Sequence, residues 1–108
     1  MTKWIDICSL ESVSPDSGVC ALVKDTQVAI FRVGSSNELY AIDNFDPFSK
    51  ANVLSRGLIG DVKGELMVAS PVYKQHFSLS TGKCFEEDEV QLKTYEIRVE
   101  KDRVEISV

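Results

Sequence analysis

The sequence is short of positive charge: 12 lysines and arginines stand against 17 aspartates and glutamates, which gives a net charge of -5. This balance opposes attraction to nucleic acid and to anionic lipid, so we expect neither as a partner. Long apolar runs are also missing, and the few that exist fall far short of the roughly 20 residues that span a bilayer. The first residues place Asp6 where a secretory signal would carry its apolar segment. We therefore expect a cytoplasmic protein that does not cross a membrane.

Cysteine and histidine are scarce as well. Cys8, Cys20 and Cys84 are odd in number and widely spaced, which excludes a disulfide framework or a zinc-ribbon pattern and predicts buried free thiols. The only histidine, His76, is expected to be a surface or hydrogen-bonded residue, not a ligand or half of a Cys–His catalytic pair. Dinucleotide, Walker, zinc-protease and nucleophile-elbow motifs are absent. The chain alone is predicted to carry no catalytic centre.

What the sequence does contain is a series of short β-forming segments. They are rich in β-branched and aromatic residues, and turn signals follow at intervals of about 8 to 12 residues, which is typical of an all-β sandwich or barrel. A chain of 108 residues is long enough for one core only, so 1–108 is expected to be a single domain. The expected strands are 4–8, 18–23, 27–33, 38–42, 58–61, 65–69, 76–79, 92–100 and 103–108.

Two stretches between these strands do not alternate, residues 44–57 and 70–75. Each contains a proline, and loops on a rigid β-scaffold are where a site is normally built. The segment 53–60, which begins in the first stretch and runs past its end, holds two glycines and Arg56, which allows two interpretations. It is either an anion-binding loop or, as we favour, a turn that covers the core. In the second case four apolar side chains enter the core: Val53, Leu54, Leu58 and Ile59.

The spacing of the two loops resembles that of Rieske proteins, in which C-P-H and C-P-x-H loops at the tip of a small β-domain hold a two-iron cluster. Here Asp46-Pro47-Phe48 is followed, after 21 residues, by Ser70-Pro71-Val72-Tyr73. A Rieske centre takes two thiolates and two imidazoles, and the resemblance places those ligands on Asp46, Phe48, Ser70 and Tyr73. Phe48 has no lone pair, the two hydroxyls keep their protons near neutral pH, and one carboxylate is a hard ligand for a soft-ligand cluster. We therefore expect this chain to bind no cluster, metal or other cofactor of its own.

A resemblance that extends beyond the two loops is carried by Trp4 and the segments 6–8, 18–22, 27–32, 46–48, 53–58 and 64–71. Over its whole length the chain resembles the small subunits of the cytoplasmic NADH-dependent nitrite reductases, Rieske-fold proteins of which one branch has lost the cluster ligands. The resemblance implies a Rieske-like antiparallel β-sandwich or barrel with a two-loop tip. It also implies a non-catalytic accessory subunit of an oxidoreductase, active in nitrate assimilation or nitrite detoxification. The implied partner is a large subunit that carries FAD, an iron–sulfur cluster and sirohaem and reduces nitrite to ammonium with NADH.

The substituted loops leave an apolar, partly aromatic tip. Because Tyr and Phe are favoured at the cores of protein interfaces, this tip is a candidate docking surface for the large subunit. Alternatively, Phe48 and Tyr73 fill the space that a cluster occupies in related proteins, and the two roles are compatible. A second function stays open, that of a free-standing, cluster-less Rieske-fold module that binds or regulates another protein. The candidate docking residues are Pro47, Phe48, Pro71, Val72 and Tyr73.

Overall fold

The computed structural model describes residues 3–34, 38–72 and 74–107. These residues form short strands and two 3-10 turns, which confirms the expected all-β fold, and no helix among them is long and apolar enough to cross a membrane. The elements are β1 (Trp4–Ser9), η1 (Leu10–Ser12), β2 (Ser17–Val23), β3 (Thr26–Arg32), β4 (Leu39–Asp43), β5 (Phe45–Asp46), β6 (Ala51–Asn52), η2 (Leu54–Arg56), β7 (Leu58–Val62), β8 (Glu65–Ala69), β9 (His76–Ser78), β10 (Thr94–Tyr95), β11 (Ile97–Glu100) and β12 (Arg103–Ser107).

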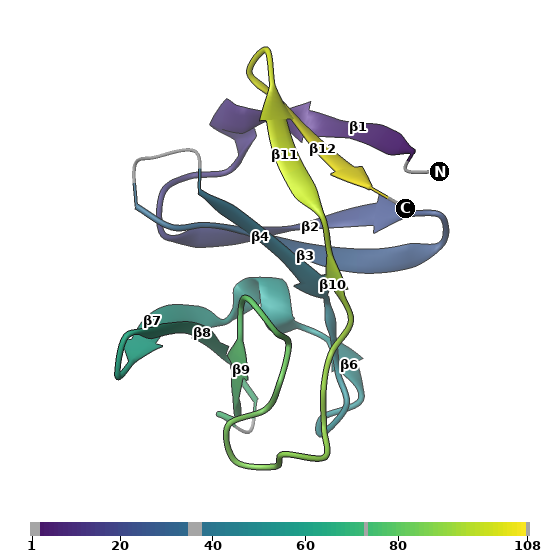
Figure 1. Cartoon of the computed structure of the whole chain (residues 1–108). Helices are drawn as coiled ribbons and strands as arrows, with labels where there is room; N and C mark the ends of the chain where they lie inside the picture. Colours follow the sequence, from purple (N-terminus) through teal and green to yellow (C-terminus); the bar gives the residue numbers. More distant parts are fainter. Residues whose placement is uncertain (1–2, 35–37, 73, 108) are drawn as a thin grey trace.

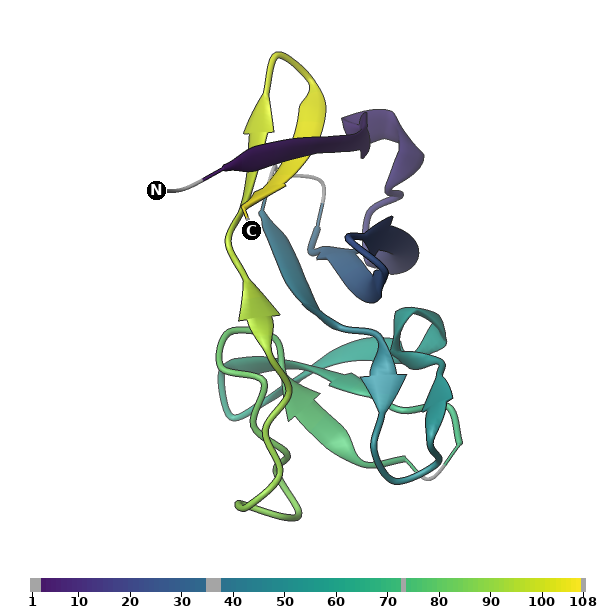
Figure 2. The ribbon, with the colours of Figure 1, turned by 90° about the vertical axis from the view of Figure 1, so that its right-hand side faces the viewer.

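The strands are arranged in three antiparallel layers, stacked from top to bottom in Figure 1. The upper sheet has the strand order β1-β12-β11, the middle sheet β10-β4-β3-β2 and the lower sheet β7-β8-β9, with the small β5-β6 hairpin beside the lower sheet. We call the upper and middle sheets (residues 4–43 and 94–107) the base, and residues 44–93 the cap. The side view in Figure 2 shows the same separation, with the first and last described strands, β1 and β12, both in the base.

The middle sheet is the wall between two hydrophobic cores. On β3, Val28 and Ile30 face the core inside the base, whereas Ala29 and Phe31 face the core of the cap. All four side chains are fully buried, which explains why this strand is an uninterrupted apolar run and does not alternate. One strand therefore supplies side chains to both halves of the molecule.

The last expected strand pair differs from the sequence-based prediction in one respect. The expected strand 92–100 is two strands, because β10 pairs with β4 in the middle sheet while β11 pairs with β12 in the upper sheet. Alternation continues through both, so the pattern cannot reveal that the chain changes layers. The hairpin itself is confirmed. Its turn residues Lys101 and Asp102 both have positive φ, 51° and 63°, as in a type I′ turn. Val108 lies outside the described residues.

The segment 53–60 is a turn that covers the cap core, but one of its predicted core residues is wrong. Leu54 in η2 is fully buried and Ile59 packs on the cap core, with Val53 half-buried. Leu58, by contrast, is 75% exposed. Because strand β7 begins at Leu58 and successive side chains point to opposite faces, Ile59 takes the inner face and Leu58 the outer one.

The three cysteines are free, and only Cys84 is buried as predicted. Cys8 is half-buried, and Cys20 is exposed on β2, an edge strand of the middle sheet. The Cys20 thiol donates a hydrogen bond to the side-chain carbonyl of Gln27 at 3.3 Å. The prediction of a buried thiol was wrong at Cys20 because nothing in the sequence distinguishes an edge strand from a central one.

Candidate functional site

The first tip loop is a tight hairpin between β5 and β6. Asp46 pairs with Ala51 across the loop, and its carbonyl accepts a hydrogen bond from the Lys50 N–H at 2.7 Å. The Asp46 side chain is fully buried, and its Oδ1 accepts the backbone N–H of Phe48 at 2.9 Å. A hydrogen bond from the backbone N–H two residues later to an aspartate carboxylate forms a local turn that Asp favours. It fixes the loop around Pro47.

The second tip loop begins at Ser70, directly after β8. Two backbone hydrogen bonds close it, from the Ser70 N–H to the Gln75 carbonyl at 2.9 Å and from the Lys74 N–H to the Ser70 carbonyl at 3.2 Å. The Ser70 hydroxyl accepts the Val72 N–H at 3.3 Å and donates to Asp46 Oδ2 at 2.5 Å. Ser70 and Asp46 are both fully buried. The structure thus brings together two of the positions that the sequence singled out, one from each loop.

The donor set at this point does not fit a two-iron cluster. Both carboxylate oxygens of Asp46 already accept hydrogen bonds, the Ser70 hydroxyl is engaged, and Phe48 offers only carbon. A Rieske cluster needs soft thiolates and imidazoles. Within residues 3–34, 38–72 and 74–107, no group of three or more His, Cys, Asp or Glu side chains is placed to hold a metal ion. Tyr73, the remaining predicted position, lies outside the described residues.

Phe48 packs on the cap core. Its ring centroid lies 6.2 Å from that of the fully buried Phe77, with the two planes tilted by 43°. Tilted aromatic pairs at this separation stabilise a fold beyond the area they bury. Phe48 is nevertheless only half-buried. Part of the ring therefore fills space inside the cap, and part stays accessible at the tip.

Apolar side chains from both loops are exposed at the tip. Val72 is 47% exposed beside exposed Pro71, and Pro47 is half-buried. Phe45 is 44% exposed and was missed by the sequence reasoning. It precedes the buried Asp46 on β5, so alternation sends it outward, but a strand of two residues is too short for that pattern to be read. Clustered exposed apolar groups mark interaction sites.

His76 lies next to the second loop and contacts an acidic segment. Its Nδ1 is 2.6 Å from Glu86 Oε2, and its backbone N–H donates to Glu86 Oε1 at 2.8 Å. Burial works against it, but these hydrogen bonds and the imidazole hold the pKa of the Glu86 carboxyl below its ordinary value. The thiol of Cys84 contacts the same carboxylate at 3.6 Å, and burial raises the pKa of that thiol. A carboxylate thus lies between Cys84 and His76, and the two do not form a catalytic pair.

Comparison with known proteins agrees with this architecture. The model of the Rieske-like [2Fe-2S] domain family matches residues 3–107, and the chain belongs to that family. A structure of the ferredoxin of carbazole 1,9a-dioxygenase from Nocardioides aromaticivorans has a TM-score of 0.80 at 20% identity, over 96% of both chains. At that identity the likeness concerns the fold alone.

Nearer relatives place the chain within the family. The nitrite reductase (NADH) small subunit of Escherichia coli strain K12 is 50% identical over 106 residues, 98% of each chain. The solution structure of the nitrite reductase [NAD(P)H] small subunit from Erwinia carotovora has a TM-score of 0.85 and 42% identity, and the match covers 100% of this chain and 83% of that one. These matches, which cover at least 98% of this chain, confirm the resemblance to the nitrite reductase small subunits.

One further relative is much longer than this chain. The nitrite reductase [NAD(P)H] large subunit of Klebsiella oxytoca is 41% identical over 101 residues, which are 94% of this chain and 10% of that protein. In that protein, a domain similar to this chain is a segment of the polypeptide named as the large subunit.

Proposed function

We propose that this chain is the small subunit of an NADH-dependent nitrite reductase and docks on the large subunit as a non-catalytic accessory partner. The observation that carries the proposal is the match to the Escherichia coli small subunit, 50% identical over 98% of each chain. The Klebsiella oxytoca large subunit, which contains a similar domain in its own polypeptide, supports close association of the two components. The reduction of nitrite to ammonium then belongs to the large subunit, in the cytoplasm.

In the proposed complex, this chain holds no cofactor of its own. The support for this absence is the chemistry of the tip, where a hydrogen bond between a carboxylate and a hydroxyl joins the positions that correspond to the two cysteines of a Rieske protein. FAD, an iron–sulfur cluster and sirohaem are assigned to the large subunit. Nucleic acid and membranes are not proposed as partners, since a net charge of -5 opposes both.

The docking surface is proposed to be the tip of the cap. The exposed apolar groups there come from both loops, and aromatic and apolar side chains dominate the centres of interfaces. The docking residues are Phe45, Pro47, Phe48, Pro71 and Val72, together with Tyr73, whose position is not described.

Affinity purification of the tagged chain from its own cells grown on nitrite tests the function. We expect a large subunit, identified by mass spectrometry, to co-purify with flavin and sirohaem absorption bands, while the chain alone is colourless and free of iron. A different partner and no such bands would favour the free-standing interaction module. Iron–sulfur bands from the isolated chain would contradict the absence of a cofactor.

Replacing Phe48 with alanine separates the two roles of the tip. Because the ring packs on Phe77, we expect a lower Tm, corresponding to about 1–3 kcal/mol for a half-buried Phe. Because the ring is also accessible, we expect weaker binding to the large subunit at temperatures where the variant is fully folded. Calorimetry gives the first quantity and interferometry the second. A lower Tm with unchanged affinity would limit Phe48 to the filling of space.

A further inference from the structure

A small pocket opens beside the second tip loop, on the face formed by η2, the start of β7 and the end of β8. Its volume is about 120 Å³, and its walls include Arg56, Leu58, Ser70, Pro71 and Lys74. This volume is well below the roughly 300 Å³ at which sites for small molecules and cofactors begin. The pocket has room for one side chain of a partner. Ser70 belongs both to this wall and to the hydrogen bond that joins the loops, so the pocket is continuous with the tip.

The chemistry of the pocket is cationic and apolar at once. Arg56 and Lys74 are both exposed, and neither forms an ion pair with an acid among the described residues. The pocket thus brings two cations together in a chain whose net charge is -5. Leu58, at 75% exposure, and exposed Pro71 provide apolar contact beside them. This combination fits an acidic side chain carried on an apolar segment.

We infer that this pocket receives a carboxylate side chain of the large subunit, with Arg56 and Lys74 as its cationic partners and Leu58 as the adjoining apolar contact. The inference rests on the proposed function and names the partner chemistry of the same tip. Arg binds a carboxylate through two parallel hydrogen bonds, which fixes orientation, while Lys adds a point charge. It also gives a role to the exposed side chain of Leu58.

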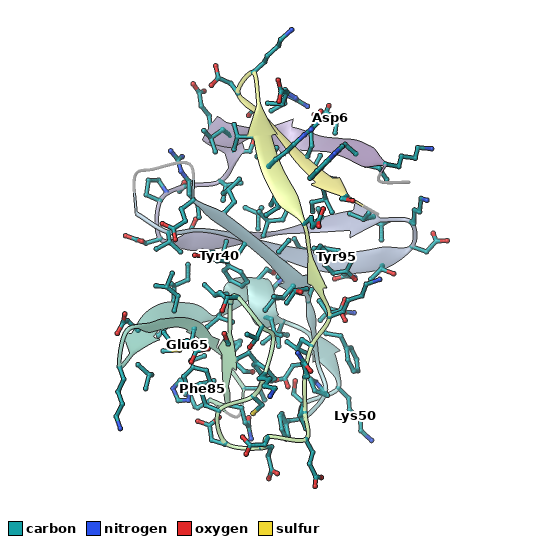
Figure 3. All side chains as sticks on the ribbon, in the orientation of Figure 1. Asp6, Tyr40, Lys50, Glu65, Phe85 and Tyr95 are labelled. Atoms are coloured by element: carbon teal, nitrogen blue, oxygen red, sulfur yellow. The ribbon has the colours of Figure 1, made fainter. Side chains whose placement is uncertain are left out.

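Charge reversal tests the inference in the assembled complex. The variant Arg56→Glu/Lys74→Glu is compared with Lys24→Glu/Lys101→Glu, which changes the net charge equally. Lys24 and Lys101 are exposed turn residues of the base with positive φ, 46° and 51°, and Lys74 has a φ of 67°. The base lies at the opposite end from the tip, as the positions of Asp6 and Lys50 show (Figure 3). Affinity for the purified large subunit is measured by interferometry at low and high salt, and Tm by calorimetry.

We expect the pocket variant to bind the large subunit at least about 30-fold more weakly at low salt, because a paired charge is lost. Its affinity should depend less on salt than that of the wild type, and its Tm should be unchanged. The control variant is expected to bind within about twofold of the wild type, since rim charges far from a contact matter little. Equal affinity of the two variants would overturn the inference, and the proposed function would stand. Failure of the wild type to bind the large subunit would overturn the proposed function itself. A third outcome combines two results: sodium nitrite shifts the amide NMR signals of Arg56 and Lys74, and the pocket variant binds the large subunit as tightly as the wild type. This outcome would assign the pocket to a free anion and would also overturn the inference.

Discussion

At the residue scale, one hydrogen bond determines how the two tip loops meet. Ser70 donates to Asp46 in a region from which water is excluded, and the other carboxylate oxygen is satisfied by a backbone N–H. A buried acceptor that loses its donor pays the full cost of desolvation, which is larger than the net contribution of an ordinary hydrogen bond. Removal of the Ser70 hydroxyl is therefore expected to destabilise the cap.

The variant Ser70→Ala removes the donor and leaves a buried carboxylate oxygen without a partner. We expect the free energy of unfolding to fall by about 1–3 kcal/mol, with a Tm lower by roughly 4–15 °C. Thermal unfolding followed by circular dichroism gives both. Ser14→Ala, at an exposed loop position, is the control and is expected to stay within about 0.5 kcal/mol of the wild type. Equal stability of the two variants would contradict the role of the hydrogen bond.

The contact between His76 and Glu86 makes a prediction about pH. The pKa of Glu86 is lowered in the folded chain from an ordinary value of 4.5, so its stabilising contribution is present above about pH 4.5 and is lost as pH falls through the folded pKa. Glu86→Gln is therefore expected to be less stable than the wild type at pH 6, by up to about 1 kcal/mol for so exposed a pair. The difference should shrink towards pH 3. Urea unfolding of both proteins at several pH values measures it, and a difference that grows on acidification would contradict the prediction.

Residue-level chemistry at the tip was predictable where it depends on spacing. The resemblance to Rieske proteins implied that the loops of Asp46 and Ser70 meet at one tip, and in the structure a hydrogen bond joins the two side chains. The filling of space by Phe48 was one of its two predicted roles. Its contact with Phe77 and the outward position of Phe45 were not predictable, because they depend on how a hairpin of two-residue strands sits on the cap. The pocket at Arg56 and Lys74 could not be predicted from the sequence either, since its lining comes from segments that meet only in the folded chain.

At the scale of elements, alternation located the longer strands and failed in the stretch 44–57. That stretch contains β5, β6 and η2, none longer than three residues. Such elements make hydrogen bonds but are too short to show a period. The hairpin between β2 and β3 turns at Lys24 and Asp25, as the sequence predicts, but both residues have positive φ without being glycine, which the sequence did not indicate. In such turns the pairing of the flanking strands imposes the backbone conformation.

Gly57 permits a close approach between η2 and β8. A Cβ at this position would lie 2.3 Å from the Ala69 carbonyl oxygen and 2.7 Å from Val68 Cγ2. We expect Gly57→Ala to lower the free energy of unfolding by about 1–3 kcal/mol, as overpacking does, measured by urea unfolding. Gly60→Ala is the matched control, because the atom it would meet, at 2.6 Å, is the flexible end of Met67. A Gly57 variant no less stable than the Gly60 variant would show that the backbone there can shift freely.

At the scale of the whole molecule, the middle sheet couples the two cores. β3 contributes buried side chains to both cores. Loss of packing in either the base or the cap would therefore expose one face of a sheet whose other face encloses the remaining core. The all-β architecture was predictable from composition and periodicity. The stacking of three sheets was not, because it depends on which strands pair across long sequence separations, as Trp4 does with Ser107.

We expect the base and the cap to unfold as one cooperative unit. Trp4 reports on the base, where the Arg98 guanidinium lies 4.2 Å from the centre of its ring. The Val68 amide, in the central strand of the lower sheet, reports on the cap. The free energy of unfolding from Trp4 fluorescence in urea should equal that from native-state hydrogen exchange at Val68. A clearly smaller value at Val68 would show that the cap opens on its own.

The pairing of Trp4 with Ser107 on β1 and β12 has a consequence for how such a domain can be attached to other chains. Both ends of the described chain leave from the base, opposite the tip (Figure 2). A covalent linker joined at either end would leave the tip uncovered, and it would hold the tip near its target at an effective concentration that reaches the millimolar range for short linkers. A domain tethered in this way needs only a weak contact surface.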